Sequence, residues 1–471
     1  MSRSKEDVLA ALKQFKSHDA RWREGRVWAG VYDAGSEVEA VAQSAYTEFL
    51  NENALYINMF PSVLALETEV VNWVKQLLRA PADARGNFTS GGTESITLAM
   101  KAARDRAAPK LGDARGEVIV CRTTHPAFHK AAHLLGMKVV ITEMTASFQA
   151  DTVAYERAIT PHTVMLVGSA PCYSHGVIDP IDALSNLAQK HSLWLHVDAC
   201  VGGIFLSTMR NMGMPVPTFD FTHEGVSSMS ADLHKYGYTA KNASTVIFRS
   251  AALRRHALYA NAHTTGYALV NSTIASSRSS GPIAAAWATI QTLGDEGYAR
   301  IVQNTMAATT RLREGVNAID GLRVMAEPVM CMFTMQCDVA SVFIIEDEML
   351  ARGWHVQTQF QAPGTPANLH LSVNQSNVAH VERFLADLKS SVEAARKEPP
   401  VNTQPLVAMV MQALQNPQAM DLNALMSQLG GESDKGGTMP ERWAMINTLL
   451  DALPDAVVDE LLLEYANGLY A

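Results

Sequence analysis

The chain has 471 residues, of which 48% are hydrophobic and 18% are charged, and its formal net charge is -9. This length allows two or more domains with a large buried core. The acidic balance, without basic runs, argues against nucleic acid as a partner. No apolar stretch is long enough to span a bilayer, and the charged N-terminus is unlike a signal peptide, so we expect a cytoplasmic protein.

Cysteine usage supports the same compartment. The sequence contains five cysteines, an odd number, with no CxxC pair and no regular spacing. A disulfide framework needs paired cysteines and an oxidising environment. We therefore expect buried free thiols.

Taken in chain order, residues 1–62 mix charged and apolar residues and predict a helical arm. Residues 63–295 predict the larger domain, in which short β-rich runs alternate with helical ones. Strands are expected over 117–121, 138–142, 163–168, 193–199, 225–231 and 244–249, and helices over 93–108, 129–136 and 180–192. Several of these strands are apolar throughout, as expected when both faces are covered. The alternation predicts an α/β domain with a mostly parallel sheet, whose ligands bind beyond the carboxyl ends of the strands.

A long helix is expected over 282–319, after which the pattern becomes more mixed. Strand-like runs at 322–326, 329–337 and 368–373 precede a helical run at 377–398. These features predict a second, smaller α/β domain over 296–398. A linker at 398–405 then leads into a helical tail over 399–471, with a loop at 430–438.

Two glycines and a threonine, Gly91, Gly92 and Thr93, stand directly before an amphipathic helix that has Glu94 in its first turn. Glycines allow a close backbone approach, and free N–H groups at a helix N-terminus attract an anion such as a phosphate. The same residues are also consistent with an ordinary loop that ends in a helix N-cap, without any ligand. The motif alone leaves both interpretations open.

Asp198 ends the apolar run 193–199, which places its carboxylate at the carboxyl end of a strand. On its own, a structural role in a turn explains it better than a binding role. His125, His129 and His133 recur at intervals of four, but Pro126 removes His125 from helical register. We therefore expect no metal site here, and of the three histidines we expect His125 to face a ligand.

Lys235 follows the expected strand 225–231 and is preceded by His234. Most lysines are solvated, so Lys235 alone indicates little. Its combination with Asp198 and the Gly-Gly-Thr loop in one α/β domain is more informative. A pyridoxal phosphate enzyme needs an amine for a Schiff base, a carboxylate for the ring nitrogen and a phosphate site.

With these residues in place, the chain resembles the group II decarboxylases among fold-type-I pyridoxal phosphate enzymes, and within them the sphingosine-phosphate lyases. The matching stretches are FPSVLALETEVV, TSGGTESITLAMKAARD, HPAFHKAAHLLGMKV, SHGVIDPI, HVDACVGGIFL and SMSADLHKYGYTAKNAS. They keep the family's order and cover nearly the whole chain. The resemblance implies the fold-type-I architecture, a large mostly parallel domain plus a smaller α/β domain, and a homodimer with shared active sites.

Carried over by position, the resemblance implies that Lys235 holds the cofactor, His125 stacks on its ring and Asp198 pairs with the ring nitrogen. It implies a substrate-facing role for Lys241, near a substrate phosphate. The residues implied to hold the cofactor phosphate are Gly92, Thr93 and His234, beside Gly91 of the same loop.

The chain departs from the lyases in the substrate half. Tyr56 stands in place of a histidine, Asn58 in place of an aspartate and Leu269 in place of a tyrosine. Two enzyme readings follow, a lyase that cleaves a sphingoid base phosphate into a fatty aldehyde and phosphoethanolamine, and an amino-acid decarboxylase with another substrate. The first is favoured because Lys241 is retained. A scaffold protein that has kept the fold without turnover is disfavoured by the intact Lys235, Asp198 and His125.

Overall fold

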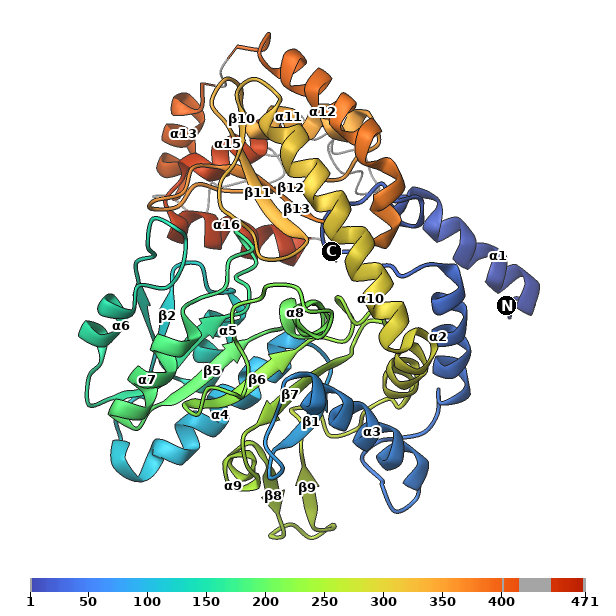
Figure 1. Ribbon diagram of the computed structural model, residues 1–471, viewed down its shortest axis with the longest axis vertical. Coiled ribbons are helices and arrows are strands. Elements are labelled where there is room, and N and C mark those ends of the chain that lie inside the picture. Colours follow the sequence, from blue (N-terminus) through green and yellow to red (C-terminus); the bar gives the residue numbers. More distant parts are fainter. Residues whose placement is uncertain (1, 400–401, 415–441, 469–471) are drawn as a thin grey trace.

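The computed structural model describes residues 2–399, 402–414 and 442–468. At the centre of its larger unit lies a seven-stranded sheet of order β1-β7-β6-β5-β4-β2-β3 (Figure 1). The strands are β1 (Arg85–Thr89), β2 (Glu117–Cys121), β3 (Lys138–Thr142), β4 (Thr163–Ser169), β5 (Trp194–Asp198), β6 (Val226–Ala231) and β7 (Ser244–Phe248). Strands β2 to β6 pair in parallel, whereas β7 is antiparallel to both β6 and β1. The predicted α/β fold with a mostly parallel sheet is confirmed.

Helices cover both faces of this sheet, which explains why its strands are apolar throughout. On one face α4 (Gly92–Leu111) and α5 (Ala127–Leu135) bury a cluster around Ile96, Phe128 and Trp194. On the other, α3 (Pro61–Leu77), α7 (Ile181–His191) and α8 (Gly202–Asn211) belong to the main core. Short helices α6 (Thr152–Ala158) and α9 (Ala251–Arg254) lie at the periphery. The two layers hold the carboxyl ends of the central strands in fixed positions.

The long helix α10 (Gly281–Asn317) connects the larger unit to a smaller one and bends at Gly294, where φ is 54°. The smaller unit has an antiparallel sheet of order β10-β11-β13-β12. Its elements are β10 (Leu322–Val324), β11 (Met332–Cys337), β12 (Gln357–Gln359), β13 (Asn368–Ser372), α11 (Val342–Ala351) and α12 (Val381–Ala395). This is the smaller α/β domain expected from the sequence.

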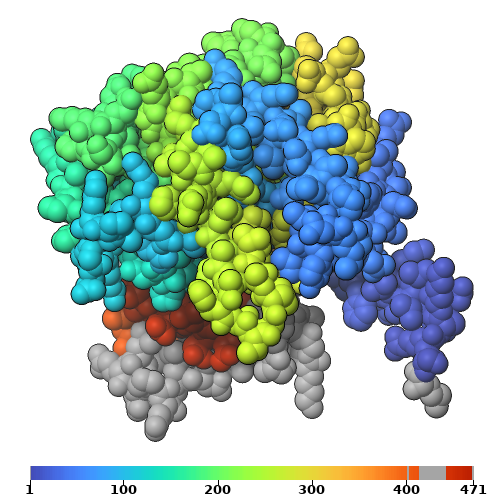
Figure 2. Space-filling view, turned by 90° about the horizontal axis from the view of Figure 1, so that it is seen from below, coloured from blue at the N-terminus to red at the C-terminus, as the bar shows by residue number. Residues whose placement is uncertain are grey.

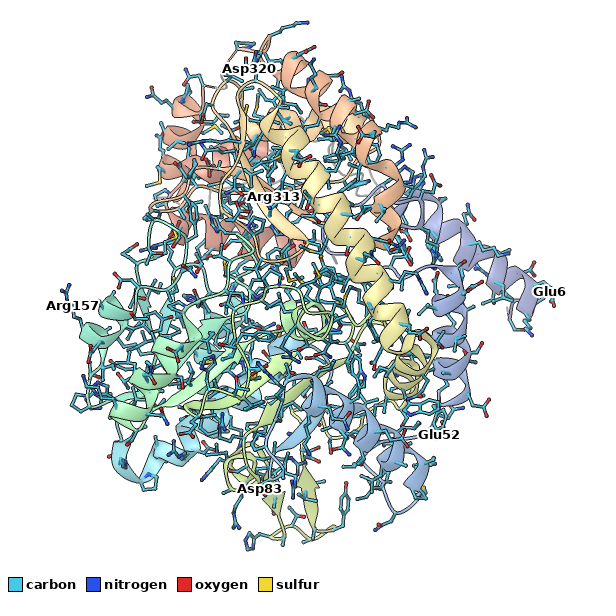
Figure 3. The ribbon with its side chains drawn as sticks, viewed as in Figure 1. Glu6, Glu52, Asp83, Arg157, Arg313 and Asp320 are labelled. Atoms are coloured by element: carbon cyan, nitrogen blue, oxygen red, sulfur yellow. The ribbon has the colours of Figure 1, made fainter. Side chains whose placement is uncertain are left out.

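The N-terminal segment begins with α1 (Lys5–Phe15), which projects from the body with Glu6 near its outer end (Figure 3). Helix α2 (Ser36–Glu48) packs along α10. Two one-turn 3₁₀ helices, Lys16–His18 and Trp22–Glu24, lie between α1 and α2. Helix α1 buries none of its side chains in this chain.

Of the predicted tail, the structure describes α13 (Gln404–Leu414), α15 (Ala444–Ala452) and α16 (Asp455–Gly468). The loop predicted at 430–438 lies outside the described residues. The three helices share a small apolar cluster of their own. They dock on α11 through Asp347, whose carboxylate accepts the N–H groups of Trp443 and Ala444 at 2.7 and 3.0 Å. The carboxylate thereby caps the N-terminus of α15.

Several elements were not predicted from the sequence. They include β1, β12, α3, α6, α8 and a hairpin of β8 (Tyr259–Asn261) and β9 (Leu269–Asn271), which protrudes from the larger unit (Figure 1) and lies on the face seen in Figure 2. Strand β1 was missed because its sequence RGNFT lacks a β pattern. Its Gly86 approaches the sheet closely: an added Cβ would lie 2.5 Å from Ile247 Cδ1. Tertiary packing therefore decides this strand.

In the described parts of the chain, every helix is too short or too polar to cross a bilayer.

Candidate active site

A cavity of about 380 Å³ opens at the carboxyl ends of the central parallel strands. Seven of the eight residues that the sequence marked as site residues line it, namely Gly91, Gly92, Thr93, His125, Asp198, His234 and Lys235. They come from the loop before α4, the loop after β2, the end of β5 and the loop after β6. Gly91 and Lys235, 144 residues apart, share one wall because β1 and β6 run in the same direction on either side of the antiparallel β7 and so end at the same edge of the sheet.

The Gly-Gly-Thr loop forms the floor of this cavity, at the N-terminus of the twenty-residue helix α4. An added Cβ on Gly92 would lie 2.8 Å from Cys200 Sγ and 2.9 Å from Asp232 Oδ2, so a side chain cannot be accommodated there. The Glu94 carboxylate accepts the N–H groups of Ser90 and Ile274, each at 2.7 Å, and so holds the loop in place. The first-turn N–H groups of α4 are left to attract an anion in the cavity.

Asp198 stands at the end of a buried hydrogen-bond chain that runs back through the sheet. Trp194 Nε1–H donates to Ser228 Oγ at 2.8 Å, and Ser228 Oγ lies 2.8 Å from His196 Nδ1. His196 Nε2 lies 3.2 Å from Ser230 Oγ, which donates to Asp198 Oδ1 at 3.1 Å. Each hydroxyl has one proton, so the chain runs in one direction, towards the carboxylate. It stabilises the ionised form of Asp198.

Nearby charges also favour the ionised form of Asp198. Burial alone raises the pKa of this carboxyl, but His125 and Lys235, with the N–H of Cys200 at 3.0 Å, hold its pKa below the ordinary value. His125 is exposed on the cavity side, and its Nδ1 accepts the N–H of Ala127 at 3.1 Å. Burial lowers the pKa of His125, although the neighbouring Asp198 carboxylate acts in the opposite direction. Asp198 is therefore a buried, permanent negative charge facing the cavity.

Lys235 forms an ion pair that the sequence analysis did not anticipate. Its Nζ lies 3.0 Å from Asp232 Oδ2, three residues earlier in the chain. Burial opposes the lysine charge, but the Asp232 carboxylate outweighs it and raises the pKa of Lys235. The other oxygen, Asp232 Oδ1, is buried and has no hydrogen-bond partner among the described residues. The spacing of three residues between Asp232 and Lys235 in the sequence could have indicated this pair.

The loop that carries Lys235 is tied down on both sides. Tyr236 Oη–H donates to the carbonyl of Val373 in the smaller unit at 3.1 Å, and Tyr298 Oη–H donates to that of Gly237 at 3.1 Å. Tyr238 adopts a left-handed backbone, with φ at 60°. Such a conformation is uncommon for a large side chain and persists only when its surroundings enforce it. The lysine is therefore held in position before any ligand binds.

Lys241 differs from the other predicted site residues because it does not line this cavity. It lines an adjacent one of about 680 Å³, where its Nζ lies 5.3 Å from the ring centre of Tyr32. Burial and the charge of Lys235 lower its pKa. The charge of Lys235 also acts on Tyr32, where it partly opposes the increase in pKa that burial causes. The two lysines are thus close enough to interact, with Tyr32 near both.

One further cavity residue, Tyr173, comes from the loop after β4. Its hydroxyl donates to Gln357 Oε1 at 2.7 Å, and its ring stacks on His370 with 4.3 Å between ring centres. Both partners belong to the smaller unit. Sequence reasoning missed Tyr173, because nothing in the letters around it indicates a contact almost two hundred residues away.

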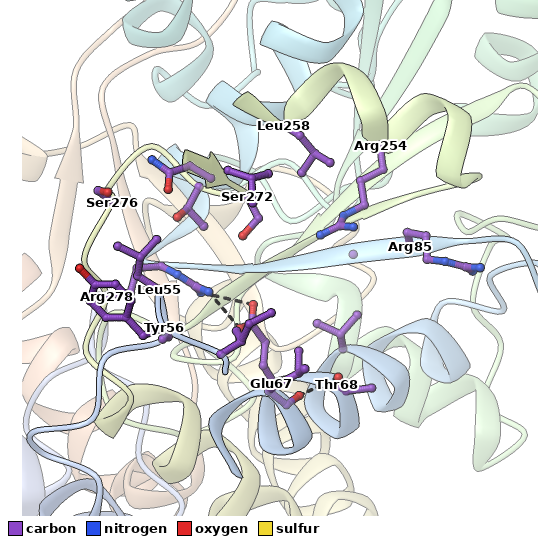
Figure 4. Close-up of a pocket in the computed structure, with 18 of the residues that line it drawn as sticks. Leu55, Tyr56, Glu67, Thr68, Arg85, Arg254, Leu258, Ser272, Ser276 and Arg278 are labelled. Carbon is purple, nitrogen blue, oxygen red and sulfur yellow. Dashed lines mark hydrogen bonds and ion pairs between the residues drawn. The ribbon is translucent and has the colours of Figure 1, made fainter. Parts of the chain in front are cut away.

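The residues that depart from the lyase pattern lie elsewhere. Tyr56, Asn58 and Leu269 line a third cavity, of about 760 Å³ (Figure 4). Arg278 and Glu67 form an ion pair in its wall, with 3.0 Å between Nη2 and Oε2. None of these residues lines the Lys235 cavity in this chain.

The Lys235 cavity fits pyridoxal phosphate. It offers an amine at Lys235, a stable carboxylate at Asp198 for a ring nitrogen, and helix N–H groups for a phosphate. The Cβ-free floor at Gly92 and the unpartnered Asp232 Oδ1 leave room for a polar ligand. His129 and His133 are both exposed, and no cluster of three metal-ligating side chains occurs within residues 2–399, 402–414 and 442–468.

Comparison with known proteins identifies the family. Residues 6–336 match the pyridoxal-dependent decarboxylase conserved domain. The chain belongs to the pyridoxal-dependent decarboxylase family. Residues 404–468 match a second family, described as the C-terminal putative HTH domain of pyridoxal-dependent enzymes.

Individual relatives fall within the same family. The chain is 38% identical to a sphingosine-1-phosphate lyase of Oryza sativa, over 83% of this chain and 73% of the rice protein. It is 31% identical to a probable L-tyrosine/L-aspartate decarboxylase of Methanothermobacter thermautotrophicus, over 74% of this chain and 93% of that one. The structure of a Burkholderia pseudomallei sphingosine-1-phosphate lyase matches with a TM-score of 0.80 and 34% identity, over 89% of this chain and 96% of that one.

These findings confirm the family resemblance, the fold class and the cofactor. The chain is a pyridoxal-phosphate-dependent lyase.

Proposed function

We propose that the chain is a carbon–carbon lyase that cleaves a phosphorylated long-chain amino alcohol, a sphingoid base phosphate, into a fatty aldehyde and phosphoethanolamine. The observation that carries this proposal is the pair of lysines around Tyr32. Lys235 lines the cofactor cavity, and Lys241 supplies a second cation beside it, where the phosphate of a substrate can bind. The similarity to sphingosine-1-phosphate lyases over most of the chain supports the same substrate class.

The site residues then have separate tasks. When bound, pyridoxal phosphate accepts the electron pair of the breaking bond. Asp198, kept ionised by its hydrogen-bond chain, holds the proton on the cofactor nitrogen. His125 would lie against the ring, and Gly92, Thr93 and His234 would bind the phosphate.

Lys235 attaches the cofactor and later moves a proton. Cleavage transfers one proton from the β-hydroxyl of the substrate to its α-carbon, so the reaction needs no external acid or water. Lys235, 3.0 Å from Asp232, is placed to deliver that proton. Asp232 positions the amine and stabilises its charged form, and the proton that Lys235 delivers is replaced by the one released from the β-hydroxyl.

An amino-acid decarboxylase is the second candidate. Tyr56, Asn58 and Leu269 replace residues of the lyase pattern, and the chain also resembles a decarboxylase from a methanogen. The same cofactor residues would serve either reaction, because pyridoxal phosphate can accept the electron pair of either bond. The substrate pocket therefore decides between them.

We also propose that the enzyme is a homodimer with shared active sites. Apolar side chains around the 760 Å³ cavity are unusually exposed, including Met59 at 67%, Tyr267 at 62% and Val270 at 64%. Such a patch is typical of a subunit interface. In the dimer, the segments that carry Tyr56 and Leu269 would reach the partner's Lys235 cavity. Mixed dimers test this: a Lys235→Ala chain and a Leu269→Arg chain, each inactive alone, should regain activity when combined.

A cytoplasmic location is part of the proposal. All five cysteines are free, and four of them are buried. Unpaired thiols persist in a reducing compartment. Cell fractionation tests this, and recovery of the protein in a secreted or membrane fraction would contradict it.

The decisive experiment is product analysis by mass spectrometry. The cofactor-loaded protein is incubated with a long-chain base phosphate, beside Lys235→Ala as the inactive control. Fatty aldehyde and phosphoethanolamine from the wild type alone would support the lyase. Carbon dioxide release from an amino-acid panel, without aldehyde, would favour the decarboxylase instead.

A further inference from the structure

A fourth cavity, of about 430 Å³, is lined by the N-terminal segment and by residues of the smaller unit, including Arg383 of α12. Three separate parts of the chain contribute basic side chains to its wall: His18, Arg21, Arg26, Arg352, His355 and Arg383. Asp19 supplies the single carboxylate found in this wall among the described residues. Three of the four arginines pair with carboxylates outside this wall, and Arg26 is the one without such a partner among the described residues.

Arg26 is the most constrained of these residues. Its carbonyl accepts the N–H of His355 at 2.9 Å, and the N–H of Trp28 donates to the carbonyl of His355 at 2.9 Å, so the segment is joined to the smaller unit. The Arg26 guanidinium lies 4.0 Å from the ring centre of Trp354. Trp354 in turn donates its indole N–H to Asp387 Oδ2 at 2.8 Å. The guanidinium is thus stacked on an aromatic face that is itself held in place.

One nitrogen of this guanidinium lacks an acceptor. Arg26 Nη1 is buried and has no hydrogen-bond partner within the described parts of the chain. A buried donor without an acceptor is unfavourable, and charged donors are the most costly to leave unmatched. Arg26 also lines the cavity, so a shift of its guanidinium towards a bound anion would supply the missing acceptor.

The other arginines have partners, but two of the pairs are weak. Arg21 lies 3.5 Å from Glu24 and Arg383 lies 3.7 Å from Asp387, and these arginine side chains are 76% and 65% exposed. Exposed pairs of this kind contribute little and exchange easily. Both arginines are therefore free to turn towards a bound anion.

The charges of two of these arginines act on a neighbouring histidine, His380. Burial, followed by the charges of Arg26 and Arg383, lowers the pKa of His380. His380 packs edge-on against Trp354, with 6.0 Å between ring centres. Four arginines and two histidines thus line one cavity of a chain that is acidic as a whole.

We propose that this cavity binds a phosphate-bearing anion, with Arg26 as the central contact and Arg21 and Arg383 closing over it. The guanidinium group presents a fork of N–H donors that matches the oxygens of a phosphate. A volume of about 430 Å³ holds more than one phosphate group, so a polyphosphate or a phosphorylated small molecule is the class that fits. The site is independent of the Lys235 cavity and of the proposed reaction.

Titration calorimetry with sodium tripolyphosphate tests this proposal, using cofactor-loaded protein so that the cofactor's phosphate site is filled. The variant Arg26→Gln should weaken binding about tenfold or more, because it removes a charge-assisted hydrogen bond. The matched control is Arg323→Gln, which removes one charge from an exposed pair with Asp338 outside the cavity. This control should bind as the wild type does.

The double variant Arg21→Gln, Arg383→Gln replaces two exposed side chains, so it should fold as the wild type does. It should also weaken tripolyphosphate binding. Co-sedimentation with phosphatidic acid vesicles identifies the source of the phosphate: binding to vesicles but not to tripolyphosphate, lost in Arg26→Gln, indicates a lipid headgroup. Equal binding by the wild type and Arg26→Gln, or no binding to either probe, would overturn the proposal.

Discussion

The Lys235 cavity and the 760 Å³ cavity differ in how they are built. The first is lined by charged groups fixed at the ends of sheet strands, such as Asp198 at 8% exposure and Asp232 at 2%. The second is lined by loop and hairpin segments whose apolar side chains are exposed, such as Met59 and Tyr267. The residues proposed to hold the cofactor therefore share one cavity, whereas those that depart from the lyase pattern line another.

The largest effect is expected from Lys235→Ala. Removing the amine abolishes covalent attachment of the cofactor and proton delivery, so activity should fall by about 10³-fold or more. Activity assays, and mass spectrometry after borohydride reduction, measure the two losses. The control Lys190→Ala removes an exposed lysine that pairs with Glu156 and should change neither. Retention of a covalent cofactor adduct in Lys235→Ala would contradict the assignment.

A somewhat smaller loss is expected when the charge opposite the cofactor nitrogen is removed. Asp198→Asn should lower kcat by about 10²-fold or more, because a preorganised charge is lost from a buried site. Ser230→Ala, which only shortens the supporting hydrogen-bond chain, should lower kcat or cofactor affinity roughly tenfold. Ser227→Ala on the same strand is the matched control. If Ser230→Ala matched the wild type in both measurements, the hydrogen-bond chain would have no role.

Substitutions of the exposed apolar side chains around the 760 Å³ cavity should weaken dimerisation. Met59→Lys and Tyr267→Lys place a charge in the proposed interface and should weaken dimerisation roughly tenfold each. Sedimentation at several protein concentrations measures this. Met212→Lys, at a side chain that is 38% exposed near the end of α8, is the control. Unchanged association in both rim variants would place the interface elsewhere.

The smallest effect concerns stability and the docking of the C-terminal helices. Burial, with the nearby charge of Asp347, raises the pKa of Glu346 to about 7 from 4.5, while Thr358 and Asn447 donate to its carboxylate at 3.1 Å. The folded carboxyl keeps its proton up to about pH 7, but the unfolded one releases it near 4.5. The free energy of unfolding should therefore fall as the pH rises between these values.

Glu346→Gln should remove that fall and raise the free energy of unfolding at pH 8 by roughly 1 kcal/mol, because no charge is then buried. Denaturation curves at pH 4 and pH 8 measure it, and kcat should not change. Glu348→Gln on the same helix is the control. A Glu346→Gln protein with the same pH dependence as the wild type would contradict the assignment.

Much of the cofactor half could be predicted from local patterns. Apolar runs marked the strands, Gly91 and Gly92 marked a helix N-terminus, and Asp198 and Lys235 stood just where strands end. Pro126 correctly separated His125 from His129 and His133, since α5 begins at Ala127. These signals are local, and parallel strands convert them into one site by a general rule.

Other parts could not be predicted because they depend on distant neighbours. Asp232 became recognisable only when its carboxylate was found on Lys235 and against Gly92. Tyr173 depends on Gln357 and His370 in the smaller unit. Strand β1 is held by pairing with β7 rather than by its own propensity.

The sequence by itself determined the alternation of the central strands and helices, because this follows from the hydrophobic period, and its motifs pointed by resemblance to the family and the cofactor. Only the tertiary structure decided that Lys241 lines a separate cavity, that Tyr56, Asn58 and Leu269 gather away from Lys235, and that arginines from three segments converge around Arg26. Those outcomes depend on how loops pack against other units, and the free energy of such contacts is not encoded in any local pattern.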